Sequence, residues 1–231
     1  EACRIAFILG VIFGLIIYFL RKNLLETPEF STYKHFLEQQ PQAPFKQILK
    51  HFRTPLWQMV VFGSFLASSL AVYTFFMPVF LSSYYHFPLA QILKYNSYSI
   101  IVFIISALLA GKFHYLFGKP FLIVSLIVFN ITNFMLFNHY AELTLQQITF
   151  IHYGILFYIG IICGRLPVLA ASFFPTQVRY SGVALSYNIS FGIVACLTQL
   201  ILFSLIKLIA IMWLPAAYIA VFSIFALLFL C

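Results

Sequence analysis

Long uninterrupted runs of apolar residues dominate the chain, and short polar segments separate them. Seven such runs can be marked, at 5–20, 56–80, 92–110, 120–138, 149–171, 182–204 and 208–231. Their lengths lie near the roughly 20 residues that a helix needs to cross a hydrocarbon core about 30 Å thick. The runs lack the two-residue alternation of a membrane barrel strand. The pattern predicts an all-α integral membrane protein of about seven transmembrane helices.

Composition excludes a water-soluble alternative. Of the 231 residues 63% are hydrophobic and 8% are charged, whereas about a quarter of the residues in a typical soluble domain are charged. Arg21 and Lys22 follow the run at 5–20 directly, without a small-residue cleavage site. That run is therefore interpreted as a span and not as a secretory signal.

The formal net charge of +8 is explained by membrane topology. Lys and Arg residues lie mostly between the apolar runs, and six of them fall in 21–55. Basic residues concentrate in cytoplasmic loops of membrane proteins. We therefore expect 21–55, 111–119 and 172–181 to lie on the cytoplasmic side. We expect the protein in the inner (plasma) membrane, with lipid and not nucleic acid as its partner.

The segment 21–55 is the one long polar connection between runs. Pro41 and Pro44 divide it into two short amphipathic pieces. In the second piece, basic residues share one face of a helix and apolar residues cover the other, a pattern typical of helices that lie in the membrane surface. We expect an interfacial linker here, and a lipid-sensing regulatory helix is the alternative.

Residue types that carry catalysis or bind metals are scarce and scattered. The four cysteines have no paired spacing, the six histidines match no metal or catalytic pattern, and the sequence has no Asp. All five Glu residues lie outside the apolar runs. An enzyme needs a nucleophile with an oriented base or a metal cluster. The sequence predicts neither, and it predicts no cofactor and no metal site.

Two stretches resemble a known family, the metabolite:proton symporters of the major facilitator superfamily, whose best-known members are proline/betaine transporters. The first is RKNLLETPEF at 21–30, and the second is FPTQVRYSG at 174–182, followed by Tyr187 and Asn188. The residues that match the two signatures are Arg21, Glu26, Thr27, Pro28, Phe30, Phe174, Pro175, Thr176, Arg179 and Gly182.

The resemblance implies both a fold and an activity. It predicts that 1–20 is the last transmembrane helix of an amino-terminal half, that 21–55 is a cytoplasmic linker, and that 56–231 is the six-helix carboxy-terminal half. It implies part of a secondary active transporter, a proton symporter for a small polar or zwitterionic metabolite such as proline or betaine. The partners would be that substrate, a proton and an amino-terminal half, and we expect the chain to be incomplete on its own.

The sequence departs from the family at the loop that helps to hold the inner gate. The loop reads GKFHYLFGKP at 111–120. It keeps Gly111, Gly118 and Lys119, but Tyr115 stands where the family has Asp. Proton-coupled carriers usually bury a carboxylate within a span, and this sequence offers none. A non-transporting membrane scaffold or a degenerate inactive remnant is therefore the alternative.

Four residues are candidates for the substrate pathway. Arg165 is a charge inside an apolar run, six residues before Ala171, or roughly 9 Å deep at a rise of 1.5 Å per residue. Such a charge costs roughly 2.5–3.5 kcal/mol unless it faces protein or water. It either faces the cavity or bonds to carbonyls freed near Pro167. Tyr73, Tyr187 and Asn188 are candidates because they sit on spans that the family uses to line its cavity.

Small residues recur at a spacing that lets two helices approach closely. Gly10 and Gly14 lie four residues apart in the run at 5–20, and Gly160 and Gly164 have the same spacing in the run at 149–171. Pairs of this kind bring helix backbones together in membranes. We therefore interpret them as a packing feature and not as a cofactor loop.

Overall fold

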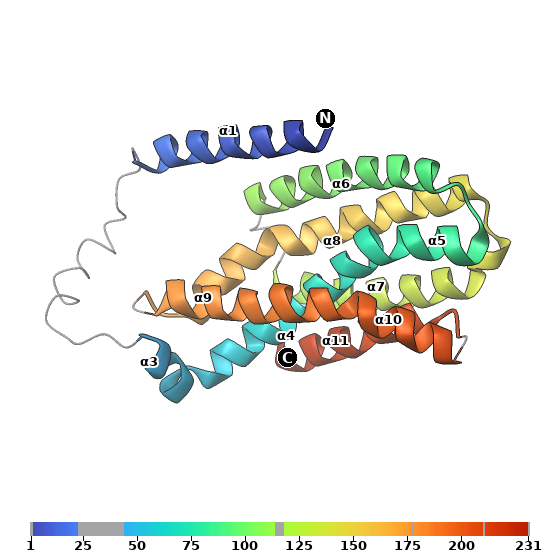
Figure 1. Ribbon diagram of the computed structural model, residues 1–231. Coiled ribbons are helices and arrows are strands. Elements are labelled where there is room, and N and C mark those ends of the chain that lie inside the picture. Colours follow the sequence, from blue (N-terminus) through green and yellow to red (C-terminus); the bar gives the residue numbers. More distant parts are fainter. Residues whose placement is uncertain (1, 23–43, 114–117, 177, 210, 231) are drawn as a thin grey trace, which may run out of the picture. The chain divides into compact units, whose positions relative to one another are not determined.

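The computed structural model describes residues 2–22, 44–113, 118–176, 178–209 and 211–230, and these ranges are helical without strands (Figure 1). The chain divides into two units, residues 1–42 and 43–231. The first unit holds α1 (Ala2–Lys22), which ends on Arg21 and Lys22. The second unit holds all the other described helices.

Several helices of the second unit join end to end into longer segments. Their bounds are α3 (Pro44–His51), α4 (Arg53–Leu70), the π-helical η1 (Ala71–Phe76), α5 (Met77–Tyr85), α6 (Leu89–Lys112), α7 (Lys119–His139), the 3-10 turn η3 (Tyr140–Glu142), α8 (Leu145–Phe173), α9 (Arg179–Tyr187), the π-helical η4 (Asn188–Val194), α10 (Ala195–Ile209) and α11 (Leu214–Leu230).

Five helical segments are long and apolar enough to cross a membrane among the described residues. They are Arg53–Tyr85, Leu89–Lys112, Pro120–Glu142, Leu145–Phe173 and Arg179–Ile209, and Leu214–Leu228 is a shorter apolar helix. The prediction of an all-helical membrane protein is confirmed. The total of seven spans and the half-transporter fold stay predictions, because α1 and α11 are not among these five.

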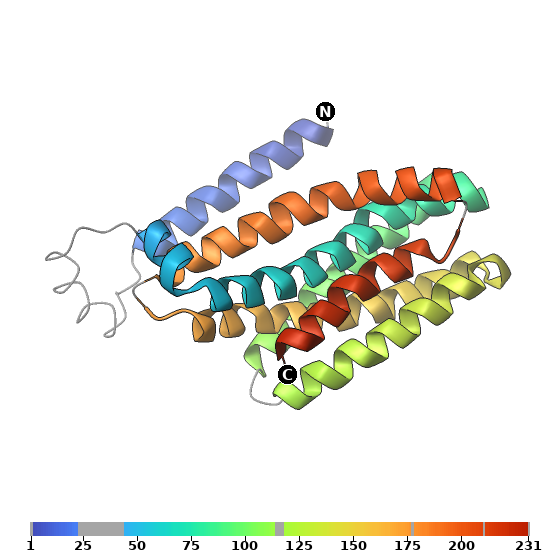
Figure 2. The same cartoon turned by 90° about the horizontal axis from the view of Figure 1, so that it is seen from below.

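The segment formed by α4, η1 and α5 runs through the middle of the second unit (Figure 2). In the most apolar 18-residue stretch of this segment 78% is buried by protein, against 17% in α6 and 22% in the segment from Arg179 to Ile209. Its α4 part packs against α8, α9, η4 and α11. The side chains of Phe65, Tyr73 and Phe76 are therefore fully enclosed by protein.

Polar side chains connect neighbouring helices inside this bundle. Lipid tails are as apolar as leucine, so helices in a membrane associate through close packing and interhelical hydrogen bonds. Hydrogen bonds between the described helices include Tyr73 to Asn133, Asn96 to the Thr74 carbonyl, Asn130 to Ser223, Ser190 to the Val60 carbonyl, and Thr198 with Tyr218.

The tightest helix contact joins α6 and α8. A Cβ atom added to Gly160 would lie 2.6 Å from the Phe103 carbonyl oxygen, and one added to Gly164 would lie 3.0 Å from the carbonyl carbon of Ala107. Only glycine leaves room for this approach. The close helix contact predicted from these two glycines is confirmed. The contact predicted from Gly10 and Gly14 stays a prediction, because nothing described lies within 4 Å of a Cβ atom added to either.

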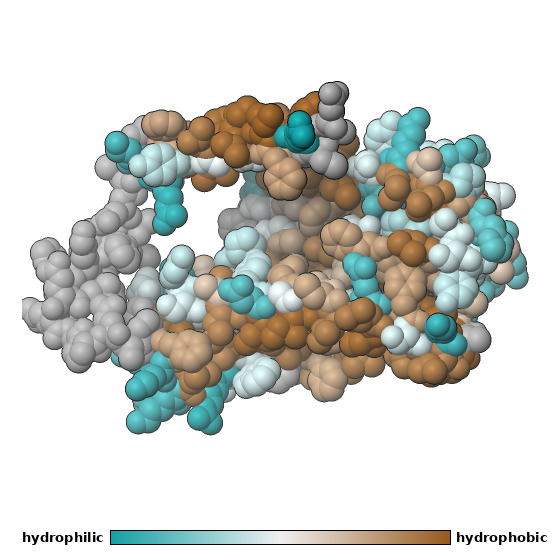
Figure 3. Space-filling model, in the orientation of Figure 1, coloured by the Kyte–Doolittle hydropathy of each residue, from teal (hydrophilic) through white to brown (hydrophobic). Residues whose placement is uncertain are grey.

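The ends of the bundle differ from its middle in polarity. Hydrophobic residues cover the middle of the bundle surface, and polar residues gather toward its ends (Figure 3). One end of the bundle holds α3, the start of α4, the end of α6 and the start of α9 (Figure 1). The basic residues at this end are Lys46, Lys50, Arg53, Lys112 and Arg179. This common end is the one that the positive-inside rule predicts to be cytoplasmic.

The helix α3 lies in the described part of the predicted linker, and the helical piece expected before Pro41 lies outside the described residues. Its apolar face packs against α4 and α9 and buries Ile48 completely, whereas Phe45 and Leu49 stay exposed. The span that follows begins at Arg53, three residues before the sequence-based boundary. The short helix α3, which packs one side against the bundle and leaves the other exposed, thus leads into the first span of the bundle.

Candidate functional site

Two membrane-length segments change from α to π winding within the span. In η1 the Met77 N–H bonds to the Val72 carbonyl, and after η4 the Ala195 N–H bonds to the Ser190 carbonyl, each five residues back. Such turns are rare and frequently occur at functional sites. Three of the four predicted pathway residues lie at these turns: Tyr73 belongs to η1, Tyr187 ends α9 and Asn188 begins η4.

The η1 turn is fixed by side chains from three other helices. The Tyr73 hydroxyl donates to Asn133 Oδ1 of α7, and its ring packs edge-on against His152 of α8 at 5.4 Å between centroids. The Asn96 amide of α6 donates to the Thr74 carbonyl over 2.9 Å. These contacts satisfy polar groups of the π turn that lipid could not satisfy.

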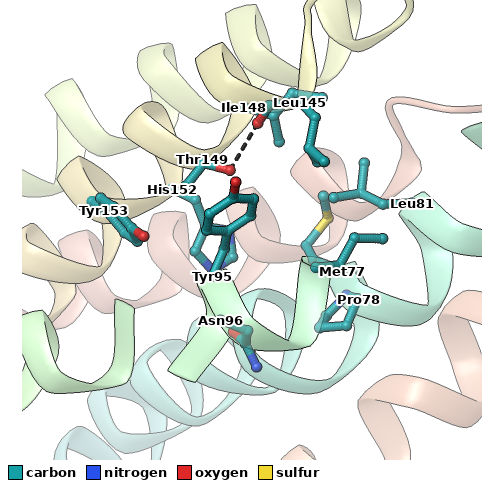
Figure 4. A pocket seen from close by; sticks show the side chains of 11 residues that line it. Met77, Pro78, Leu81, Tyr95, Asn96, Leu145, Ile148, Thr149, His152 and Tyr153 are labelled. Atoms are coloured by element: carbon teal, nitrogen blue, oxygen red, sulfur yellow. Dashed lines mark hydrogen bonds between the residues drawn. The ribbon is translucent and has the colours of Figure 1, made fainter. Parts of the chain in front are cut away.

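A small pocket lies beside this network, between α5, α6 and α8 (Figure 4). Its polar and aromatic lining comes from Tyr95, Asn96, Thr149, His152 and Tyr153, and its apolar lining is Met77, Pro78, Leu81, Ile92, Leu145 and Ile148. The cavity volume is about 20 Å³. That volume suffices for one water molecule and not for an amino acid.

The η4 turn is fixed by close packing on α4. The Ser190 hydroxyl donates to the Val60 carbonyl over 2.9 Å, and a Cβ atom added to Gly63 would lie 2.6 Å from Ser190 Oγ. The Tyr187 ring stacks on Phe191 at 5.3 Å between centroids. Ser190 is fully buried, and the glycine opposite it makes the contact possible.

The remaining predicted pathway residues are spread over two helices. Asn188 is exposed and donates to the Ala184 carbonyl of its own helix over 2.8 Å. Arg165 is partly buried on α8, eight residues before the helix ends at Phe173. Its depth is therefore about 12 Å from that end, more than the sequence suggested. The helix continues through Pro167.

The structure does not gather the four residues into one cavity. Tyr187 lines a closely packed seam with Leu166, the residue after Arg165. Tyr73 instead contacts Asn133 of α7 and His152 of α8. The pathway role of Arg165, Tyr73, Tyr187 and Asn188 stays a prediction.

The second family signature closes the turn between α8 and α9. Arg179 Nε donates to the Phe174 carbonyl over 3.1 Å. The buried Phe174 ring covers Gly182, where an added Cβ atom would lie 2.6 Å from the ring, and the Val178 N–H bonds to the Pro175 carbonyl over 3.1 Å. The spacing of this motif therefore serves a compact turn, in which Thr176 is partly buried.

The other predicted motifs are described only in part. Arg21 is exposed in the last turn of α1, whereas Glu26, Thr27, Pro28 and Phe30 lie outside the described residues. In the gate loop, Gly111 lies in the last turn of α6, and Gly118 directly precedes α7, which begins at Lys119. Tyr115 lies outside the described residues, so the gate chemistry stays a prediction.

Sequence reasoning missed Asn96, Thr74 and His152 as parts of a site. An amide or imidazole inside an apolar run is costly unless it is paired within protein, and this was the available signal for Asn96 and His152. Thr74 gave no signal, because it takes part through its backbone carbonyl and not through its side chain. Among the described residues, no group of three His, Cys, Asp or Glu side chains is placed to hold a metal ion.

Sequence comparison places the chain beside solute transporters. It is 29% identical over 251 residues to the glycine betaine/proline/ectoine/pipecolic acid transporter OusA of Dickeya dadantii, which covers 97% of this chain and 46% of OusA. The proline/betaine transporter of Escherichia coli K12 is 29% identical with the same coverage. The ectoine/proline transporter ProP of Corynebacterium glutamicum is 26% identical over 96% of this chain and 46% of ProP.

These relatives confirm the resemblance to proline/betaine transporters that the two motifs indicated. The chain spans about half the length of the curated relatives it matches. No protein-family model matches the sequence, and no solved structure matches it significantly. Together with these relatives, the five apolar helical segments confirm a multi-pass protein of the inner (plasma) membrane.

Proposed function

We propose that the chain forms the carboxy-terminal half of a proton-coupled secondary transporter for a small polar or zwitterionic metabolite such as proline or betaine. The observation that carries this proposal is the alignment of nearly the whole chain with transporters of such solutes. The substrate and the coupling ion of this chain are part of the proposal. They come from the names of its relatives and from the motif resemblance.

The geometry supports a transport role in a second way. Secondary transporters bind substrates near helices that are interrupted within the membrane, where backbone groups become available. The chain has two such interruptions, η1 and η4, in two different spans. Tyr73, Tyr187 and Asn188 lie at these interruptions, and Arg165 on α8 supplies the charge for a substrate carboxylate in this proposal.

Alternating access requires two repeats that rock around a site near the membrane midplane. We therefore propose an amino-terminal half as the partner of this chain. The rival function is a membrane scaffold or an inactive remnant, and one observation favours it: the sequence has no Asp, and its Glu142 is an exposed residue at the end of a span, 3.2 Å from His139.

Uptake measurements separate the two functions. Bacteria that lack their own proline and betaine carriers would express the chain alone, or together with the amino-terminal half of the Dickeya dadantii transporter. We expect background uptake of labelled proline and betaine with the chain alone, and saturable uptake that an uncoupler abolishes with both halves. Normal membrane insertion without uptake in either case, and also with the chain's own upstream coding sequence, favours the scaffold.

Arg165 gives the sharpest variant for the same assay. A planar guanidinium holds a carboxylate through two parallel hydrogen bonds, which a lysine ammonium cannot reproduce. In the proposed transporter Arg165→Lys should insert normally and lose most uptake. The exposed Lys94, on the surface of α6, provides the matched control as Lys94→Arg. An active and more stable Arg165→Leu protein would end the functional role of this residue.

A further inference from the structure

The pocket between α5, α6 and α8 contains two polar atoms that no contact explains. Asn96 Oδ1 and His152 Nε2 both line it, both are shielded from solvent, and neither has a hydrogen-bond partner among the described residues. His152 is only 8% exposed. Figure 4 shows Asn96 on α6 and His152 on α8 among the side chains that line the pocket.

The chemistry of these atoms defines what can bind between them. The Asn96 amide nitrogen donates to the Thr74 carbonyl, so the other end of the amide is the oxygen, which can only accept. A neutral imidazole with its proton on Nδ1 presents Nε2 as a second acceptor. A buried acceptor without a donor is costly, so in this tautomer of His152 a group that carries two hydrogens would satisfy both atoms.

We propose that this pocket is a binding site for a small hydrogen-bond donor with two hydrogens, which bridges His152 Nε2 and Asn96 Oδ1. The volume of about 20 Å³ selects one water molecule in this conformation. The bridge continues a chain of hydrogen bonds from the Thr74 carbonyl through Asn96 to His152. It therefore connects the π turn η1 to α8 through α6.

If the proposed transport function holds, a second molecule can supply a donor group with two hydrogens. The secondary ammonium of proline carries two N–H groups, as water carries two O–H groups, whereas the quaternary ammonium of betaine carries none. In a more open conformation proline could replace the water at this site. Betaine lacks the hydrogens to do so, and this difference separates the two sources.

Nuclear magnetic resonance of the 231-residue chain in lipid nanodiscs tests the site directly. His152 can be assigned without any variant, because Ile151–His152 is the only Ile–His pair in the sequence. We expect the Nε2 resonance of an unprotonated, hydrogen-bonded ring nitrogen and magnetisation transfer from water to this ring. The exposed His139, which pairs with Glu142, is the internal control.

Proline and glycine betaine are then added separately. A shift of His152 with proline alone, without a shift of His139, identifies the ammonium as an additional occupant. No shift with either compound, with the water contact retained, identifies water as the occupant. A protonated Nε2 that donates directly to Asn96, the absence of water contact, or an equal shift with betaine overturns the proposal. These outcomes do not depend on whether the chain supports uptake.

Discussion

The two π turns of the bundle have the same backbone hydrogen bonding, but different contacts with neighbouring helices hold them in place. The turn η1 lies in the central segment, with Tyr73 and Phe76 fully buried, and side-chain bonds from α6 and α7 fix it. The turn η4 buries only Ser190 completely, and the Ser190 hydroxyl reaches the Val60 carbonyl only because Gly63 of α4 carries no side chain there. One turn depends on polar groups that reach in from other helices, and the other depends on the absence of a side chain.

This difference has consequences for function. A turn held by hydrogen bonds can exchange partners when water or a substrate group enters, because each bond has a polar alternative. A turn held by close packing has one arrangement, since protein interiors tolerate little added volume. We therefore expect η1 to respond to ligands and η4 to serve as the fixed side of the pair.

The largest effect is expected at the close contact of η4. In Gly63→Ala the new methyl group displaces the Ser190 hydroxyl from the Val60 carbonyl, so the free energy of unfolding should fall by about 2 kcal/mol. Unfolding in mixed micelles by SDS titration measures this change. Gly192→Ala is the control, because nothing lies within 4 Å of a Cβ atom added there. Equal losses in both variants would show that packing does not hold η4.

A somewhat smaller effect is expected at the polar contact of η1. Asn96→Ala removes the donor to the partly buried Thr74 carbonyl, and the free energy of unfolding should fall by about 1.5 kcal/mol. Asn188→Ala is the matched control, since its exposed amide bonds only within its own helix. The control should change stability by less than about 0.5 kcal/mol. A silent Asn96→Ala would mean that η1 needs no partner from α6.

The smallest effect is expected for a single hydroxyl group. Tyr73→Phe removes the donor to Asn133 and keeps the ring against His152. Interhelical hydrogen bonds in membranes contribute about 0.6 kcal/mol on average, so the same titration should show a loss of that size. Tyr187→Phe, which keeps the stack on Phe191, should leave stability nearly unchanged. A larger loss in Tyr187→Phe would reverse the assignment of polar and packed turns.

The sequence predicted the helices better than it predicted their interruptions. Hydropathy marked each span of the bundle, since apolar runs and helical spans coincide in lipid, but the structure begins the first at Arg53 and ends α8 at Phe173. A π turn inserts one residue without altering the apolar pattern, so neither η1 nor η4 was visible. Gly160 and Gly164 did mark a contact, whereas Gly10 and Gly14, with the same spacing, meet nothing described within 4 Å, so the spacing permits a contact without identifying it.

The candidate site was harder to predict for a physical reason. Asn96 and the Thr74 carbonyl lie on different helices, 22 residues apart, and only the packing of α6 on the central segment brings them together. The signature residues Phe174, Arg179 and Gly182 were recognised from their order. Their shared task of closing one turn became evident from the contacts of the folded chain.

The glycine contact between α6 and α8 has a mechanical consequence. Two helices whose backbones touch at Gly160 and Gly164 cannot slide or rotate past each other without separating first. We therefore expect α6 and α8 to move as one unit, in which Asn96 keeps a fixed spacing from His152. Any bending within the bundle would then fall on the two segments that contain π turns. In the central segment we expect it at η1, where Asn96 of α6 binds the Thr74 carbonyl.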